Sequence, residues 1–276
     1  MSLKQLFLLA ALMFFVHVSS SHAQIWKKVQ NSLEEKASNK LDDVLNGKKR
    51  TEGSQQSTAE STERSNAPRL EEVYAFQPGD SVIFATDFVN DTKGRMPKRW
   101  KSSGSGSVAS VEGLSGNWLA LAEQSTYKID SLFDTPDNFT IEFDLVTRSS
   151  ESADIGSMSF GFARDNSVKN QLLDAYNGNA ITNTQLHFHN QEVTNASSDT
   201  ENYTTLDFPL ANYANALLHV AIAVEGDILS VYINKNKVLD TRMFNKEVPK
   251  FFYVTAPFSY EQQSQVYFGN FVMATD

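Results

Sequence analysis

The segment Glu142-Phe143-Asp144 places two carboxylates at positions i and i+2. In an extended strand these positions lie on one face, so both carboxylates can reach a single ligand. Two carboxyl groups about 5–5.5 Å apart can hydrolyse a glycoside with retention, one as nucleophile and one as proton donor. The same pattern also describes an ordinary amphipathic strand whose polar side chains face water. We expect the amphipathic strand, with Glu142 and Asp144 as candidate ligand-binding residues.

Two histidines, His187 and His189, have the same spacing and therefore share a strand face. Two imidazoles can bind a metal ion when a carboxylate joins them, and Glu192 lies nearby in the sequence. Nothing in the spacing fixes the position of that carboxylate, and a metal site requires a complete ligand set. We therefore expect His187 and His189 to be candidate ligand-binding residues and expect no metal ion there.

An oxygen-rich segment at Asp87, Asn90 and Asp91 is the candidate calcium site of the chain. Calcium takes about 6–8 oxygen ligands, and this segment offers only some of them. Asn and Asp also favour polar turns, because their side chains bond to the nearby backbone. We expect a polar turn, with calcium as the only cofactor that the sequence suggests.

Sugar-binding sites combine exposed aromatic rings with nearby amide and carboxylate groups. The segments Tyr176-Asn177-Gly178-Asn179 and Asn202-Tyr203-Thr204-Thr205 each place a tyrosine in a polar loop. The preferred candidates for binding a sugar are therefore Tyr176, Asn177, Asn179 and Tyr203. Other aromatic candidates are Trp100, Tyr127, Tyr213 and Trp118, the last in an apolar run that suits the core.

The elements that position these residues are predicted from hydrophobic alternation, which dominates the chain from residue 70 onward. Many short strands with turns between them and almost no helical period predict an all-β antiparallel sandwich over residues 68–276. The clearest predictions are strands at 139–145, 158–162 and 266–274, a hairpin of 218–224 with 228–233, a second turn at 234–237, and one helical turn at 171–176.

The N-terminus has the pattern of a secretory signal peptide over residues 1–23. Lys4 precedes an apolar run at 6–18, and Ser21-His22-Ala23 supplies the small residues of a cleavage site. This run is shorter than the roughly 20 apolar residues that span a bilayer. We expect an exported protein whose mature chain begins at Gln24.

Two further segments precede the sandwich. Residues 24–47 carry an apolar residue at every fourth position among charged ones, which predicts an amphipathic helix. This helix either contacts a membrane surface or a protein partner, or is a solvated spacer. Residues 48–67 are polar and of low complexity, which is typical of a flexible linker.

Composition excludes several classes of protein. The net charge of −9 argues against a nucleic-acid partner, because phosphate binding needs a basic surface. The absence of cysteine excludes disulfides, thiolate metal sites and cysteine nucleophiles. An exported chain without cysteine suits a bacterial envelope better than an animal extracellular space. The 19 Phe and 9 Tyr residues favour sheets.

Several segments carry a resemblance to known proteins. Residues 219–240 resemble the hairpin of concanavalin A-like (laminin-G-like) jelly rolls, and residues 139–144 and 266–274 are similar to two strands of that superfamily. Residues 74–84 are similar to the start of β-sandwich modules that precede outer-membrane-protein-A-like domains in Gram-negative envelope proteins. The resemblance implies a jelly-roll sandwich over 68–276. It does not include the peptidoglycan-binding domain of those relatives, because the sequence ends at Asp276.

Concanavalin A-like glucanases carry an E-x-D-x-x-E strand, and the resemblance implies nucleophile and tuning roles for Glu142 and Asp144. The third position of the motif is Thr147, which cannot donate a proton at neutral pH. A carboxylate from another strand, Glu192 or Glu201, stays open as a replacement. We therefore expect a module without catalytic activity.

The function expected from these observations is that of a non-catalytic binding or scaffold module of the bacterial cell envelope, with carbohydrate as its ligand. The protein would be periplasmic, associated with the outer membrane or extracellular. The alternatives are a divergent glycoside hydrolase of the glucanase type and a purely structural partner of an envelope complex.

Overall fold

The computed structural model describes residues 74–132 and 135–276. One compact unit, Pro68–Asp276, contains all of them. The signal peptide, amphipathic helix and linker expected over residues 1–67 lie outside the described residues and stay predictions.

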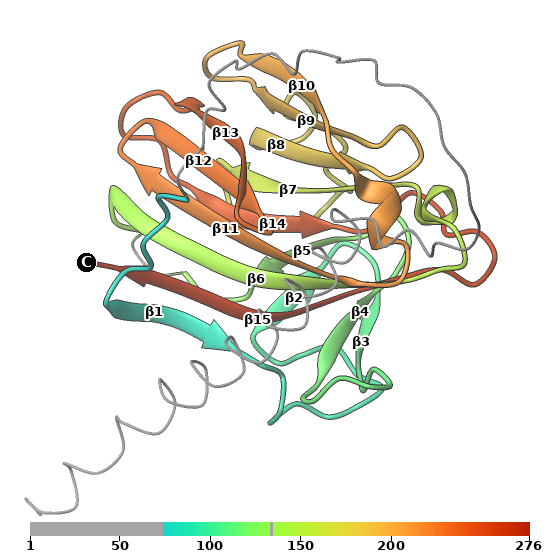
Figure 1. Ribbon diagram of the computed structural model, residues 1–276. Coiled ribbons are helices and arrows are strands. Elements are labelled where there is room, and N and C mark those ends of the chain that lie inside the picture. The colour runs from blue at the N-terminus through green and yellow to red at the C-terminus, as the bar shows by residue number, and fades with distance from the viewer. Residues whose placement is uncertain (1–73, 133–134) are drawn as a thin grey trace, which may run out of the picture. The chain divides into compact units, whose positions relative to one another are not determined.

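The described strands lie in two layers (Figure 1). We name the first layer the β6 sheet after its central strand. Its strands all pair antiparallel, and β1 pairs with β15 beside the main path. In spatial order they are β13 (Asn236–Arg242), β12 (Ile228–Ile233), β11 (Leu217–Glu225), β6 (Asn138–Arg148), β15 (Gln265–Thr275), β4 (Trp118–Leu121) and β3 (Gly106–Ala109), with β1 (Ser81–Thr86) on β15.

The second layer, the β7 sheet, is also antiparallel throughout. Its strands in spatial order are β10 (Tyr203–Asp207), β9 (Glu192–Ser197), β8 (Ala180–His187), β7 (Ser157–Ala163), β14 (Phe251–Thr255), β5 (Thr126–Ile129) and β2 (Trp100–Ser102). Within the described residues, two short 3-10 helices, η1 (Ser152–Ile155) and η2 (Leu210–Tyr213), lie in the connections between strands. The all-β antiparallel sandwich predicted from hydrophobic alternation is confirmed.

Phenylalanine rings fill the space between the sheets. The ring centroid of Phe143 in β6 lies 5.3 Å from that of Phe160 in β7 and 5.3 Å from that of Phe268 in β15. Tilted and edge-on contacts of this kind are the favourable aromatic geometries. Because Phe143 and Phe160 face inward, alternation places Glu142 and Ser159 on the outer faces of two different sheets.

The predicted hairpins form at the expected turns. β11 and β12 flank Gly226, whose φ of 61° is in the left-handed region that glycine adopts without steric cost. β12 and β13 are joined through Asn234 and Lys235, whose φ values of 47° and 69° suit a two-residue turn of the primed type.

The closing strand β15 contains an irregularity that the sequence did not predict. Its register shifts between Gly269 and Val272, and Asn270 has a φ of 53°. Phe268 and Phe271 are both buried in the core, so strict alternation is broken between them. The bulge brings the Asn270 amide to the outer face of the β6 sheet.

The helical turn predicted for residues 171–176 is not formed. Instead, a carboxylate oxygen of Asp174 accepts hydrogen bonds from the backbone N–H groups of Tyr176 and Asn177, at 2.6 and 2.8 Å. An aspartate side chain that satisfies nearby amides stabilises a turn in place of a helix.

Candidate functional site

A long loop at residues 164–179, here called the crossing loop, lies on the outer face of the β7 sheet. The backbone N–H of Leu172 donates to the hydroxyl of Thr126 in β5 at 2.8 Å. The Leu172 side chain packs against Ala163 of β7 and Tyr253 of β14. The loop therefore covers part of this face. Its edge forms one side wall of the space above the part of the sheet that stays exposed to solvent.

A buried lysine holds the start of the crossing loop. Lys128 of β5 has no exposed surface, and its ammonium donates to the backbone carbonyl of Asp165 at 2.8 Å. Burial lowers the pKa of Lys128 to about 8, although the nearby Asp165 carboxylate opposes that shift. A lysine buried this deeply is costly, and its hydrogen bond places the loop directly above β5.

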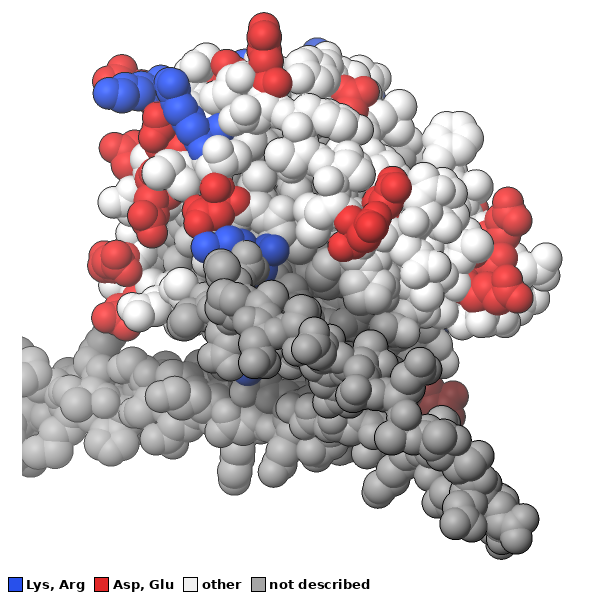
Figure 2. Space-filling model, turned by 45° about the horizontal axis from the view of Figure 1, so that its top comes forward, with Lys and Arg blue, Asp and Glu red and all other residues white. Residues whose placement is uncertain are grey.

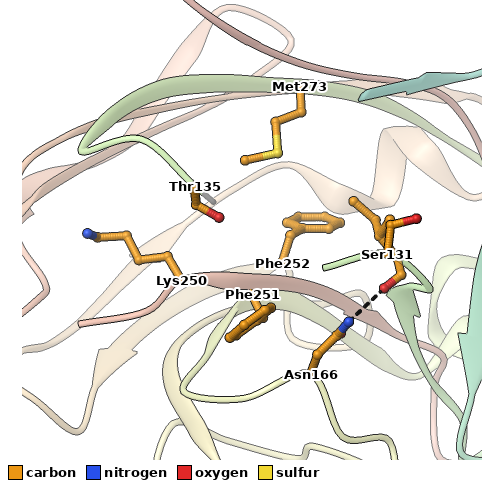
Figure 3. Close-up of a pocket in the computed structure, with 8 residues that line it drawn as sticks. Ser131, Thr135, Asn166, Lys250, Phe251, Phe252 and Met273 are labelled. Atoms are coloured by element: carbon orange, nitrogen blue, oxygen red, sulfur yellow. Dashed lines mark hydrogen bonds between the residues drawn. The ribbon is translucent and has the colours of Figure 1, made fainter. Parts of the chain in front are cut away.

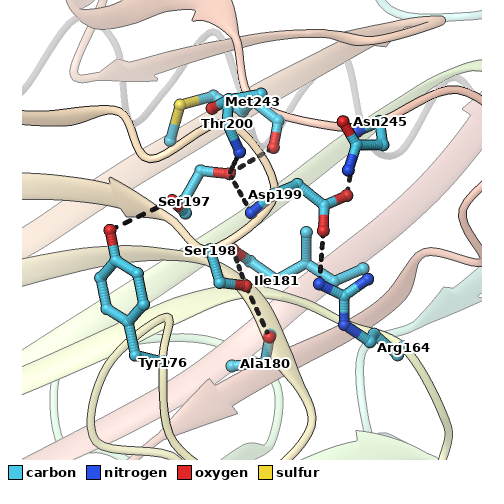
Figure 4. Close-up of polar contacts among 10 residues, drawn as sticks. All are labelled: Arg164, Tyr176, Ala180, Ile181, Ser197, Ser198, Asp199, Thr200, Met243 and Asn245. Carbon is cyan, nitrogen blue, oxygen red and sulfur yellow. Dashed lines mark hydrogen bonds and ion pairs between the residues drawn. The ribbon is translucent and has the colours of Figure 1, made fainter.

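A polar network holds the end of the crossing loop (Figure 4). The Tyr176 hydroxyl donates to the backbone carbonyl of Ser197 at 3.3 Å, while 61% of the Tyr176 residue stays exposed. The Ser197 hydroxyl donates to the carbonyl of Met243 at 2.6 Å. Arg164, at the start of the loop, pairs with the Asp199 carboxylate. The tyrosine ring is thus fixed in place with much of its surface open to solvent.

A pocket of about 210 Å³ opens between the crossing loop and the outer face of the β7 sheet. It is smaller than the roughly 300–1,000 Å³ of drug-sized sites and suits one small ring. None of the residues that line it is charged. We name it the loop pocket, and its lining is Gly156, Ser157, Ser159, Gln171, Leu172, Leu173, Gln185, Thr255, Ala256, Phe258 and Ser259.

Some polar side chains of the loop pocket already form hydrogen bonds within the protein, and one does not. The hydroxyls of Ser159 and Thr255 lie 2.8 Å apart and bond to each other. The Gln171 amide donates to the Ala256 carbonyl at 3.0 Å. Among the described residues, the Gln185 side chain has no hydrogen-bond partner, so its amide is available to a ligand.

The rim of the loop pocket is apolar. Leu173 of the crossing loop is 48% exposed, and Phe258, which follows β14, is 63% exposed. An apolar rim with amide and hydroxyl groups inside matches a sugar ring, which presents C–H faces and a circle of hydroxyls.

The residues of the loop pocket were not predicted from the sequence. A signal was present, because the inward run of Met158, Phe160 and Phe162 requires the small polar Ser157 and Ser159 to face outward. A strand with serines on its outer face provides a polar floor. Nothing in the sequence indicated that the crossing loop would form a wall above it.

His187 lies beside the loop pocket, and its Nδ1 atom is 3.0 Å from the Ser157 hydroxyl oxygen. The ring centroids of His187 and His189 are 6.2 Å apart. Burial and the neighbouring His189 lower the pKa of His187, while Glu192 opposes the shift. Within residues 74–132 and 135–276, no group of three His, Asp or Glu side chains is arranged so that it could hold a metal ion.

The other candidates on this side of the molecule lie in the crossing loop and at the sheet edge. Asn177 accepts the Leu173 N–H through its side-chain oxygen at 3.0 Å, and Asn179 donates to the Asp165 carboxylate. Tyr203 begins the edge strand β10 and is 66% exposed. Tyr176, Asn177, Asn179, His187, His189 and Tyr203 therefore all belong to the β7 sheet or its connections.

The acidic pair lies on the opposite side of the sandwich. Glu142 and Asp144 project from the outer face of the β6 sheet, where both meet His219 of β11. The Asp144 carboxylate lies 2.8 Å from His219 Nδ1 and accepts the Asn270 amide at 2.7 Å, and Glu142 lies 3.3 Å from His219 Nε2. Burial disfavours the charged imidazole, but the hydrogen bond to Asp144 and the charges of the two carboxylates outweigh burial and raise the pKa of His219 to about 10.

Thr147, the third position of the E-x-D-x-x-E motif, is on the other face of β6. It is fully buried, and its hydroxyl donates to the carbonyls of Tyr213 and Ala216. Glu192 and Glu201, the two replacements that the sequence left open, belong to β9 and the turn after it, in the β7 sheet. The outer face of β6 therefore presents two carboxylates joined through an imidazole, without a third acidic group from these positions.

The remaining aromatic candidates are interior residues. Trp100 packs against Phe268 at 5.1 Å between ring centroids. Trp118, Tyr127 and Tyr213 are also buried. Of the aromatic residues singled out by sequence, only Tyr176 and Tyr203 expose their rings.

The candidate calcium loop follows β1. Asp87 accepts the Val89 N–H, and Asp91 accepts the Lys98 N–H, both at 3.0 Å. These are the backbone contacts of a polar turn. Calcium binding by Asp87, Asn90 and Asp91 stays the untested alternative to this turn.

A second, smaller pocket of about 20 Å³ lies at one end of the interface between the sheets (Figure 3). Met273 of β15 and Phe252 of β14 face it from the two sheets, while the Lys250 side chain points away. A cavity must hold about 10–15 Å³ to admit one water molecule. This pocket therefore has room for little more than one water.

On the face shown in Figure 2, acidic side chains are scattered over a surface that is mostly uncharged. No described helix is both long and apolar enough to cross a membrane.

No protein-family model matches this chain, and no curated protein is significantly similar to it. Solved structures with a similar fold include the carbohydrate-binding module CBM66 from Bacillus subtilis, 15% identical with a TM-score of 0.44, covering 64% of this chain and 96% of that one. The carbohydrate recognition domain of Emp47p is 12% identical with a TM-score of 0.49, covering 69% and 94%. Arcelin-5, a lectin-like defense protein from Phaseolus vulgaris, is 11% identical with a TM-score of 0.47, covering 69% and 96%.

These neighbours are named as a carbohydrate-binding module, a carbohydrate recognition domain and a lectin-like defense protein, and they resemble this chain in general architecture alone. The fold of this chain is defined by its own strand pairing. The similarity to modules of outer-membrane-protein-A-like proteins stays a prediction.

Proposed function

We propose that this protein is an exported, non-catalytic module that binds carbohydrate through the loop pocket. The observation that carries the proposal is the loop pocket itself, which combines an uncharged polar floor with an apolar rim on one face of a rigid sheet. Sites with a few well-placed polar groups among apolar walls are the usual form of small-ligand sites.

The composition of the pocket lining favours neutral sugars. A sialic acid or uronic acid carries a carboxylate, which proteins usually meet with Arg or Lys. The lining contains neither, and its free amide at Gln185 can both donate to and accept from a sugar hydroxyl. The ligand class is therefore a neutral mono- or oligosaccharide.

Tyr176 and Tyr203 extend the proposed surface beyond the loop pocket. Both rings are more than half exposed, and both belong to elements of the β7 sheet or its connections. Exposed tyrosines offer flat apolar faces with a polar tip, which suits contact with further sugar units. Glu142 and Asp144 lie outside this surface, because they project from the other sheet.

The cellular location proposed for this module is the bacterial envelope or the extracellular space. The support is the signal-peptide pattern of residues 1–23 together with the absence of cysteine. Mass spectrometry of the exported chain checks this part, and the expected N-terminus is Gln24. A secreted chain that begins at Met1 contradicts it.

The function is tested on a glycan array with the full chain, in buffers with calcium and with a chelator. We expect binding to neutral glycans without turnover. Gln185→Ala removes the free amide, and the loss of one buried hydrogen bond predicts an affinity about tenfold lower. Gln77→Ala is the matched control, because Gln77 is an exposed glutamine outside the loop pocket. Equal loss in both variants, or no binding to any glycan, overturns the proposal.

A further inference from the structure

The loop pocket has one titratable neighbour whose contact with it is direct. His187 does not line the pocket, but its Nδ1 atom lies 3.0 Å from the hydroxyl oxygen of Ser157, which does. A serine hydroxyl rotates freely, so its partner decides whether it presents a hydrogen or a lone pair to a ligand. The state of His187 is therefore transmitted to the floor of the pocket.

We propose that His187 is a positioning residue that sets the direction of the Ser157 hydroxyl, and that protonation of His187 reverses this direction and weakens binding of a neutral sugar. The inference rests on the proposed function, since it names a control on the same pocket.

In the neutral state, His187 carries its proton on Nε2 and accepts at Nδ1. The Ser157 hydroxyl then donates to Nδ1, and its lone pairs are turned to the pocket, where they accept from a sugar hydroxyl. In the protonated state both ring nitrogens are donors. Nδ1–H then donates to Ser157, so the serine hydrogen turns away from His187, and a sugar hydroxyl that had donated to Ser157 must rotate and give up that hydrogen bond.

The groups around His187 place this change below neutral pH. β9 contributes Glu192, which pairs with His187 across the strands, and β10 contributes Asp207 opposite Glu192. The turn after β8 contributes His189, and β7 contributes the uncharged Ser157. Burial and His189 lower the pKa of His187 from its ordinary 6.5, with Glu192 in opposition.

The third described histidine does not titrate in the same range. His219 lies on the other sheet, and its pKa is raised to about 10, so it stays charged between pH 5 and 8. A pH profile measured in this range is therefore free of a contribution from His219.

The test measures the affinity of the full chain for its best neutral oligosaccharide by calorimetry from pH 4.5 to 8. We expect a constant affinity at neutral pH and, below the pKa of His187, a fall that levels off at about tenfold, the effect of one lost hydrogen bond. His187→Gln keeps an amide beside Ser157 but cannot titrate, so its profile is flat. His189→Gln keeps the loss of affinity at acid pH and moves it to higher pH, because the neighbour that lowers the pKa of His187 is gone.

A second measurement does not need a ligand. Nitrogen-15 NMR of the imidazoles reports which ring nitrogen carries the proton, and we expect an unprotonated Nδ1 in His187 at pH 8. Ser157→Ala removes the hydrogen bond to Nδ1, so we expect it to shift the Nδ1 resonance and to flatten the affinity profile.

Two results overturn the inference: a proton on Nδ1 of His187 at pH 8, or a fall in affinity at acid pH that persists in His187→Gln. If no neutral glycan binds at any pH, the proposed function fails, while the NMR measurement still decides whether Ser157 donates to His187.

Discussion

His219 and Asp144 face each other across the paired strands β11 and β6, with 2.8 Å between His219 Nδ1 and an Asp144 carboxylate oxygen. Glu142 approaches the other ring nitrogen at 3.3 Å, so one imidazole lies between two carboxylates. The Asn270 amide holds the second oxygen of Asp144 from the bulge in β15. Two neighbouring carboxylates are also what a retaining glycosidase uses. Here, however, the Asp144 carboxylate is already hydrogen-bonded to His219 and Asn270.

Substituting Glu142 tests the glycosidase alternative. We expect Glu142→Gln to fold normally and to keep its glycan-binding profile, because Glu142 lies on the sheet opposite the loop pocket. The measurements are a thermal melt, the glycan array and a reducing-end assay on β-glucans. Release of reducing ends by the wild type that is lost in Glu142→Gln would establish an enzyme and refute the binding module.

The imidazole cluster predicts a pH dependence of stability at alkaline pH. The pKa of His219 is about 10 in the folded chain and near 6.5 in the unfolded chain, so the folded state binds its proton more tightly. This contribution is complete below pH 6.5 and is lost as the pH rises through about 10. Urea unfolding from pH 6 to 10 should show a steeper decline for the wild type than for His219→Gln. Parallel curves would contradict the assigned pKa.

Removing the buried lysine is predicted to loosen the crossing loop. The pKa of Lys128 is lowered to about 8, so below that pH the fold carries a buried charge, and this cost disappears as the pH rises past 10.5. Lys128→Met should therefore keep global stability near pH 7. It should also speed hydrogen exchange at the Leu172 amide and reduce glycan affinity several-fold, because the loop loses its bond to β5.

Lys169→Met is the control for that experiment, since Lys169 is an exposed lysine of the same loop. Unchanged exchange at Leu172 in Lys128→Met, or equal change in both variants, would show that the lysine does not hold the loop.

Ser197 is predicted to matter for stability more than its neighbour. Its buried hydroxyl donates to Met243 and accepts the backbone N–H groups of Asp199 and Thr200. Ser197→Ala leaves these groups without a partner and should cost about 1–3 kcal/mol in denaturant unfolding. Ser198→Ala, at a less buried site, should cost about 1 kcal/mol or less. The reverse order would mean that the network in Figure 4 does not hold the loop region.

The strands were predictable because their physical cause is local. Alternation in residues 139–145 and 158–162 requires one face of each strand to be buried, and the turn at Gly226 needs only a residue that tolerates a left-handed φ. The bulge at Asn270 was not predictable in this way. It depends on how β15 meets β6, and that pairing joins residues more than a hundred positions apart.

The sequence by itself determined an all-β sandwich, the positions of its main hairpins, and the preference for Tyr176 and Tyr203 over the other aromatic candidates. Those conclusions follow from side-chain period and local polarity, which are properties of neighbouring residues. Only the tertiary structure decided which of the candidate site residues lie close together. Alternation shows that Asp144 and His187 face outward, but it does not reveal that they belong to different sheets. The loop pocket exists only because long-range pairing aligns Ser157, Gln185 and Thr255 on adjacent strands and the crossing loop folds above them.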